Sequence, residues 1–135
     1  MNNIGFWNVR GMNSRTKQFE INRLLRQNNV GLFGLLETRI KSSSLQNNVF
    51  TSEGQWSVVT NYQQHKGGRI WLIWDPSIFE LSDIRTYVQC IHVKVRVRIT
   101  AQNFWLTLVE GRNNAAERCE LWQRIRQVRR ELESG

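Results

Sequence analysis

Residues 31–36 read Gly-Leu-Phe-Gly-Leu-Leu, a continuous apolar run that stops at Glu37. Six residues are too few for a buried helix, and a run of this kind is typical of a strand covered on both faces. The segment therefore predicts a strand in the middle of a sheet, with a carboxylate at its carboxyl end.

Two elements before this run give it a context. Residues 1–9 predict a strand that ends at Asn8. Residues 15–27 carry apolar residues at helical spacing and predict a helix, which Asn13 or Ser14 can cap. A strand, a helix and a strand within forty residues form a βαβ unit, so the two strands are expected to be parallel with a right-handed crossover. Asn8 and Glu37 then lie at the edge where open α/β sheets place their sites.

The remaining sequence extends this α/β pattern. Residues 41–53 are polar and predict a loop with a helical turn at best, and the last apolar stripe predicts a helix that begins at Asn113 or Asn114. Strands are expected over 55–62, 69–74, 91–99 and 104–109.

Residues 91–99 alternate between two faces. One face is apolar, and the other carries His92, Lys94, Arg96 and Arg98. This period of two predicts a half-buried antiparallel strand whose basic face is in contact with solvent.

Composition limits the class of protein. A chain of 135 residues, 40% of them hydrophobic, is long enough for one domain with a core. The net charge of +8 favours a polyanionic partner, most simply nucleic acid, over an ordinary solvated basic surface. No apolar segment is long enough to span a membrane, and no secretory signal is evident. Cys90 and Cys119 lack metal-type spacing and are expected to be free thiols, so a nuclear or cytoplasmic, intracellular location is expected.

The two strand ends predict a metal site. A carboxylate after a buried strand loses hydration unless it is exposed, paired or bound to a cation. Glu37 beside Asn8 supplies the hard oxygen ligands that Mg²⁺ prefers. The alternative is that Glu37 caps the next turn and that Asn8 hydrogen-bonds a loop.

Five segments carry a resemblance to a known family. They are residues 7–11 (Trp-Asn-Val-Arg-Gly), 36–38 (Leu-Glu-Thr), 67–76, 91–95, and Arg118 with Leu121-Trp122. In this order they resemble the endonuclease/exonuclease/phosphatase superfamily. More closely, they resemble the N-terminal part of the endonuclease domain of plant LINE-type (non-LTR) retrotransposons.

The resemblance implies an α/β fold in which two sheets form a four-layer sandwich with outer helices. For this chain it implies the front half of that fold, a partial four-layer sandwich in which a mixed sheet has helices on one face. It also implies Mg²⁺-dependent hydrolysis of a phosphodiester, with Glu37 as metal ligand and Asn8 organising the metal and the phosphate. In retroelements, the nick in target DNA primes reverse transcription.

The family's later catalytic groups have no match in the sequence. Neither Asp75 nor Asp83 lies in a Gly-Asp-x-Asn context, and neither His65 nor His92 follows a Ser-Asp pair. Residues 1–135 are thus expected to be a single truncated domain without the C-terminal Asp/Asn and Asp/His motifs, and very poor as a nuclease alone. Glu110 stands where the family usually has a phosphate-contacting Tyr, which is read as drift rather than function.

Truncation also predicts a folding defect. If the chain supplies little more than one sheet, the inner sides of strands 31–36, 69–74 and 104–109 are left partly uncovered. Exposed apolar sheet surface favours self-association.

Three functions remain open from the sequence. The first is a truncated or decayed retroelement endonuclease domain, with enzymatic activity uncertain. The second is a non-catalytic nucleic-acid-binding module that uses its basic residues: Arg10, Lys94, Arg96, Arg98, Arg118 and Arg124, with further arginines in the last helix. The third is an interaction fragment that pairs with a chain supplying the missing half.

Overall fold

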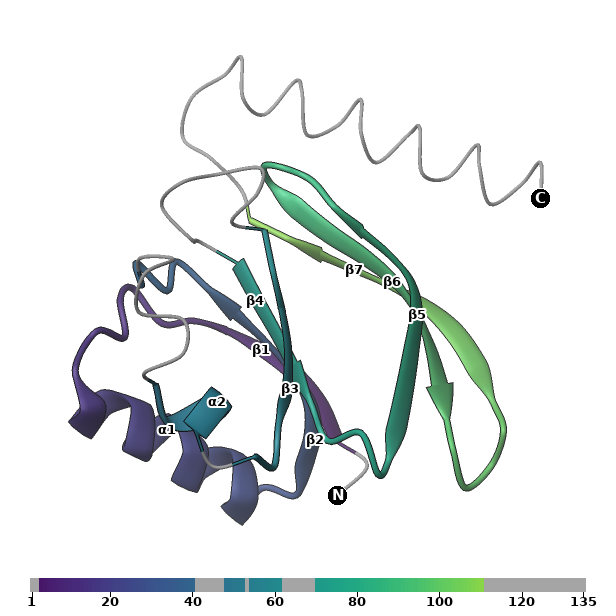
Figure 1. Cartoon of the computed structure of the whole chain (residues 1–135), viewed down its shortest axis with the longest axis horizontal. Coiled ribbons are helices and arrows are strands. Elements are labelled where there is room, and N and C mark those ends of the chain that lie inside the picture. The colour runs from purple at the N-terminus through teal and green to yellow at the C-terminus, as the bar shows by residue number, and fades with distance from the viewer. Residues whose placement is uncertain (1–2, 41–47, 53, 62–69, 111–135) are drawn as a thin grey trace.

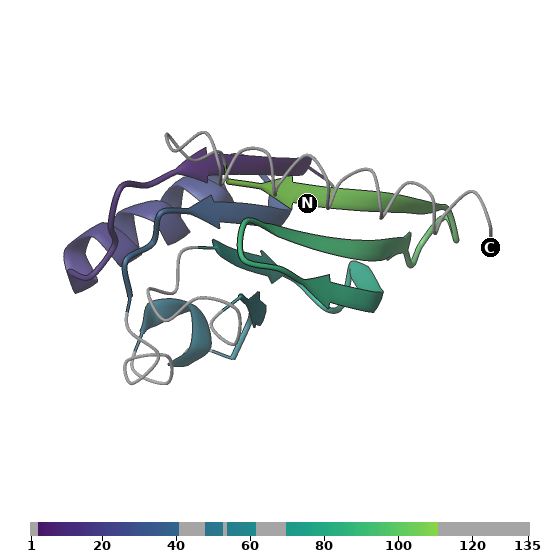
Figure 2. The same ribbon diagram turned by 90° about the horizontal axis from the view of Figure 1, so that it is seen from above.

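The computed structural model describes residues 3–40, 48–52, 54–61 and 70–110. Within them the chain forms two β-sheets and two helices, arranged as three layers (Figures 1 and 2). A four-stranded sheet (sheet A) has the order β1-β2-β4-β3, and a three-stranded sheet (sheet B) has the order β5-β6-β7.

The predicted βαβ unit opens the chain. Strand β1 spans Asn3–Asn8, helix α1 spans Arg15–Gln27 and strand β2 spans Val30–Leu36. The two strands are parallel, and Asn8 is in register with Leu36. Ser14 is the N-cap of α1, because its hydroxyl accepts a hydrogen bond from the backbone N–H of Lys17 at 3.1 Å. These elements confirm the predicted boundaries within two residues.

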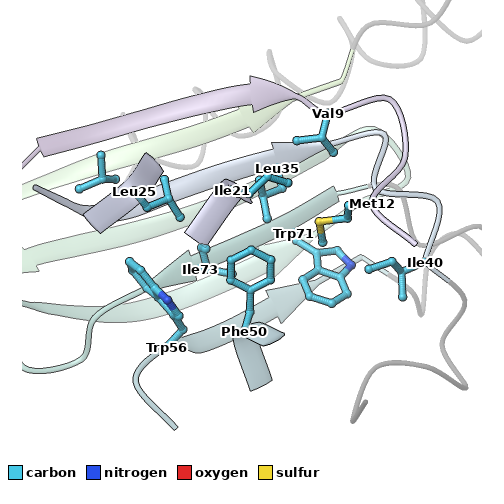
Figure 3. Close-up of a cluster of buried hydrophobic side chains, with 11 residues drawn as sticks. Val9, Met12, Ile21, Leu25, Leu35, Ile40, Phe50, Trp56, Trp71 and Ile73 are labelled. Atoms are coloured by element: carbon cyan, nitrogen blue, oxygen red, sulfur yellow. The ribbon is translucent and has the colours of Figure 1, made fainter. Parts of the chain in front are cut away.

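Sheet A is completed by two strands that follow a short helix. Helix α2 spans Val49–Ser52, β3 spans Ser57–Thr60 and β4 spans Ile70–Trp74. Strand β4 lies between β2 and β3 and is antiparallel to both. Helices α1 and α2 cover one face of the sheet, over a core that includes Trp71 and Phe50 (Figure 3).

Sheet B covers the other face of sheet A. Its antiparallel strands are β5 (Phe79–Thr86), β6 (Cys90–Val97) and β7 (Asn103–Val109). A second apolar cluster fills the space between the sheets, with Leu32, Leu36, Ile70 and Leu72 from sheet A and Phe79, Ile91, Val93, Val95 and Leu108 from sheet B. A Cβ at Gly34 would lie 2.5 Å from Leu108 Cδ1, so this glycine lets β2 and β7 approach closely.

The facing layer that the sequence seemed to lack is therefore present, and the expected exposure of strands 31–36 and 69–74 was wrong. Both strands are buried under sheet B. Strand β5, which was not predicted, brings β6 and β7 over them. Exposed apolar surface occurs instead on β1, where the side chain of Phe6 is 72% exposed. Since β2 packs against β7 and β4 against β6, β1 extends beyond the edge of sheet B.

Residues 91–99 include a strand, as predicted, but the strand ends earlier than expected and one residue of its polar face is buried. It ends at Val97, and Ile99 lies beyond it in a turn with 86% of its side chain exposed. His92, expected to contact solvent, is only 2% exposed. Its ring stacks on Trp105 at 4.9 Å and its Nδ1 lies 2.7 Å from Thr107 Oγ1. Aromatic stacking and a hydrogen bond at Nδ1 thus offset part of the cost of burying His92, whose Nε2 has no hydrogen-bond partner among the described residues.

Several predictions fall outside the described residues: the helix expected over 114–132, Arg118 and Arg124 within it, Cys119, and His65. Cys90 is buried at the start of β6 and is not part of a disulfide among the described residues. Within the described part of the chain, no helix has the length and apolar character needed to cross a membrane.

Candidate metal centre

Asn8 and Glu37 lie at the neighbouring carboxyl ends of β1 and β2, at one edge of sheet A, as the βαβ topology predicted. The segments that leave β1 and β2 stay paired beyond the strands. Val9 N–H donates to Leu36 O at 3.0 Å, Gly11 N–H to Glu37 O at 2.6 Å, and Met12 N–H to Thr38 O at 2.8 Å. This pairing fixes the backbone on both sides of the two candidate ligands, so the pair is preorganised by main-chain hydrogen bonds.

The carboxylate of Glu37 sits between buried neighbours but keeps access to solvent. Leu36 and Thr38 are buried, whereas the side chain of Glu37 is 28% exposed. Its Oε2 lies 3.8 Å from Nη2 of Arg39, a more exposed residue two positions later. The charge is therefore balanced by an arginine that solvent can reach, an arrangement that a cation can displace. Arg39 was not singled out from the sequence.

Asn8 is exposed, and its Oδ1 accepts a hydrogen bond from the backbone N–H of Arg10 at 3.3 Å. The alternative role foreseen for Asn8, a hydrogen bond to a loop, is therefore real. An amide oxygen has two lone pairs, so this bond leaves one for a cation or for a water on that cation.

The backbone at this edge adopts an uncommon conformation. Arg10, Glu37 and Arg39 have φ angles of 52°, 54° and 57°. This left-handed region is unfavourable for residues with a Cβ, and it persists where the surroundings fix it. Two side chains of α1 support the loop, because Lys17 Nζ donates to Val9 O and Gln18 Nε2 to Met12 O.

The donor set fits one end of a Mg²⁺ site. A carboxylate and an amide oxygen are hard ligands, and Mg²⁺ is commonly held by one or two carboxylates and several waters. Among the described residues, no group of three or more His, Cys, Asp or Glu side chains comes together. The described part of the chain therefore offers a two-residue metal end rather than a complete cage.

The other acids and the imidazole considered above do not join Glu37. Asp75 lies at the opposite end of β2, where its N–H donates to Gly31 O at 2.8 Å. His92 alternates with the inward-facing Val93 of β6 and so lies on the outer face of sheet B. Burial lowers the pKa of His92, and the nearby charge of Arg85 lowers it further.

Glu110 follows β7 and is buried, with its N–H donating to Gln89 O at 2.9 Å. Asn61, also buried, joins this region to the metal end. Its Oδ1 accepts from Ile70 N–H at 3.1 Å, and its Nδ2 donates to Val88 O at 3.0 Å. Ile70 is in register with Leu36, so Asn61 connects the two sheets at the end that carries Glu37. The sequence analysis missed this role, for which an isolated Asn gives no signal.

The expected basic residues are divided between two places. Arg10 is exposed and adjoins the metal end. Lys94 and Arg96 lie on the outer face of sheet B, where Lys94 Nζ is 6.0 Å from the centre of the Trp105 ring. Arg96 and Arg98 both pair with Glu80, at 4.0 and 3.5 Å. This shared carboxylate reduces the positive charge available to a phosphate backbone.

Comparison with solved structures identifies the fold. The chain is similar to the mannosyl-6-phosphatase of Bacteroides thetaiotaomicron, with a TM-score of 0.71 and 11% identity over 98% of this chain and 60% of that one. It is also similar to the human Nocturnin catalytic domain with bound sulfate, with a TM-score of 0.57 and 15% identity over 90% and 56%. No family model matches the chain, and no curated protein matches its sequence.

Both neighbours have endonuclease/exonuclease/phosphatase-type folds, so the predicted fold class is confirmed as a partial fold of this type. The chain spans about three fifths of the length of these neighbours. The described residues account for a helix layer and two sheets of the expected four layers.

Proposed function

We propose that this chain is the front part of a Mg²⁺-dependent endonuclease domain that hydrolyses phosphodiesters in DNA, of the kind found in LINE-type retroelements. The observation that carries the proposal is the placement of Asn8 and Glu37 at adjacent parallel strand ends, in a fold whose neighbours include a phosphatase. The sequence resemblance described above supports the retroelement assignment.

Each residue at the metal end has a defined task in this proposal. Glu37 holds the cation through its carboxylate, and Asn8 orients it or one of its waters through Oδ1. Bound Mg²⁺ would supply charge neutralisation at the phosphate. Arg39 must release Glu37 before the cation binds, and Arg10 then lies beside the site as a phosphate contact.

We further propose that the chain by itself is a truncated or decayed domain with little or no hydrolytic activity. Within the described residues, Glu37 is not part of a group of three or more His, Cys, Asp or Glu side chains that could hold a metal and activate water. General acid and base groups each contribute about 10²- to 10⁴-fold to catalysis, so their loss leaves mainly binding.

The test compares Glu37→Gln with Glu20→Gln, an exposed acid on α1 that serves as a matched loss of charge. Thermal melts with and without Mg²⁺ measure cation binding, and nicking of supercoiled plasmid measures hydrolysis. We expect Mg²⁺ to raise Tm in the parent and in Glu20→Gln but not in Glu37→Gln, because only Glu37 is a ligand. Any nicking is expected to disappear in Glu37→Gln.

An unchanged Mg²⁺ response in Glu37→Gln would remove the metal end and with it the proposal. The alternative is a non-catalytic nucleic-acid-binding module, which the net charge of +8 favours. Gel retardation that weakens steeply with salt, persists in Glu37→Gln and occurs without nicking would support that alternative.

A further inference from the structure

Glu110 is a carboxylate that the proposed function leaves unused. It follows strand β7, and only 3% of its surface is exposed. Burying a carboxylate is costly unless hydrogen bonds, a paired charge or a metal ion compensates for its charge. A glutamate in such a place is therefore under physical constraint, unlike a residue that has drifted on an open surface.

The side chain of Glu110 is on the face of β7 that is directed toward sheet A. Phe104, Leu106 and Leu108 alternate along β7 and pack into the apolar cluster between the two sheets. The pairing of β6 with β7 continues past the end of β7, because the N–H of Glu110 donates to Gln89 O at 2.9 Å. Position 110 therefore keeps the alternation of the strand, and its side chain follows that of Leu108 on the inner face.

Strands β2 and β7 end at the same end of the two-sheet sandwich. The last residue of β2 is in register with Ile70, at the start of β4. Asn61 joins Ile70 to Val88, just before β6 begins, and the start of β6 pairs with the end of β7. Figures 1 and 2 show β2 and β7 running in the same direction. Glu37 and Glu110 thus leave the two sheets at one end of the molecule.

The contact between Gly34 and Leu108 relates the positions of the two acids along the strands. Leu108 Cδ1 lies 2.5 Å from the position that a Cβ would have at Gly34, so β2 and β7 touch there. Glu37 is three residues beyond this contact and Glu110 is two residues beyond it, which differ by about 3 Å at the rise of a β-strand. Sheets packed face to face are about 10 Å apart, a distance that a glutamate from each sheet and one shared cation can bridge.

We infer that Glu110 is a second carboxylate ligand of the metal end, which reaches the cation from sheet B. The inference rests on the proposed function, because Glu37 and Asn8 supply the other oxygen ligands. Mg²⁺ is commonly held by one or two protein carboxylates together with water, so the added ligand fits the ion. Without a cation the two negative charges repel a phosphate, so phosphate binds at this end only together with the metal.

Calorimetric titration of the full chain with Mg²⁺ tests the assignment, with Glu110→Gln, Glu37→Gln and Glu80→Gln as variants. Glu80 is an exposed acid on the outer face of sheet B, so its replacement matches the loss of charge away from the metal end. We expect Glu110→Gln and Glu37→Gln each to weaken Mg²⁺ binding by at least about tenfold, because each removes a ligand. Glu80→Gln is expected to leave the affinity within about twofold of the parent.

The three variants separate the failure of the inference from the failure of the proposed function. Mg²⁺ binding that is lost in Glu37→Gln but unchanged in Glu110→Gln would overturn the inference and leave the proposed function standing. A parent chain that binds no Mg²⁺ would overturn both.

Paramagnetic relaxation in NMR spectra locates the cation in the unaltered chain and does not depend on how Glu110→Gln folds. Mn²⁺ takes the same hard oxygen ligands as Mg²⁺, and it broadens the amide signals of residues near it. We expect small amounts of Mn²⁺ to broaden the signals of Glu37, Gln89 and Glu110, but not that of Gly31 at the other end of β2. Broadening of Glu37 without Gln89 and Glu110 would place the cation away from sheet B and overturn the inference.

Discussion

Strands β1 and β2 are neighbours in one sheet and neither carries a charge, yet β2 is almost wholly buried and β1 is largely exposed. Helices α1 and α2 cover one face of β2, and sheet B covers the other. In the part of the chain that the structure describes, sheet B has one strand fewer than sheet A, and its β7 lies under β2 and leaves β1 beyond its edge. Burial of a strand in this fold is therefore set by how the sheets are aligned, more than by the strand's own composition.

Replacing one aromatic residue from each environment tests this difference most strongly. Trp71 in β4 is fully buried in the helix-side core, and Trp71→Ala is expected to lower the free energy of unfolding by about 3–5 kcal/mol. Phe6→Ala is expected to change it by about 0.5 kcal/mol or less, because Phe6 is already hydrated in the monomer. Urea unfolding of dilute protein measures both changes in the free energy of unfolding. Similar changes for the two substitutions would contradict the placement of Trp71 in the core and of Phe6 on the surface.

The alignment of the sheets depends on Gly34. Substitution of this glycine is expected to change the free energy of unfolding less than Trp71→Ala does. Gly34→Ala places a Cβ against Leu108 and is expected to cost about 1–3 kcal/mol, as overpacking does. In a Leu108→Ala background the same substitution is expected to be nearly neutral, since the methyl groups that it meets are gone. A double-mutant cycle of unfolding free energies measures this coupling. Purely additive effects would show that β2 and β7 do not touch here.

The smallest effect concerns the outer face of sheet B, where burial holds the pKa of His92 below its ordinary value of 6.5. At a pH between the folded and unfolded pKa values, the unfolded chain binds more protons. Stability is therefore complete above about pH 6.5 and falls as the pH decreases through that range. The difference in Tm between pH 7.5 and 5.5 is expected to be larger for the parent than for His92→Gln. An identical pH dependence of the two proteins would indicate that His92 is freely hydrated.

The first forty residues could be predicted from the sequence because each local signal agrees with the tertiary structure. Apolar periodicity gave α1, and the uninterrupted apolar run gave β2. Topology then placed Asn8 and Glu37 together, since the carboxyl ends of paired parallel strands always share an edge.

Strand β5 was not predicted, because its apolar-polar alternation covers only residues 79–82 and breaks at Asp83. A register shift between Ser82 and Arg85, with Asp83 at a φ of 50°, interrupts the period of two. The facing sheet therefore went unnoticed, and the inner surface was wrongly expected to be bare. His92 was misassigned for a related reason: alternation identifies the face of a side chain but not whether Trp105 covers it.

The left-handed backbone at Glu37 sets stability and metal binding against each other. A glycine there would relieve an unfavourable conformation, and in the same step it would remove the carboxylate and its pairing with Arg39. A substitution that stabilises the backbone at position 37 would therefore remove the candidate metal ligand. The acidic residue at this position therefore carries a conformational cost that the proposed cation-binding role would offset.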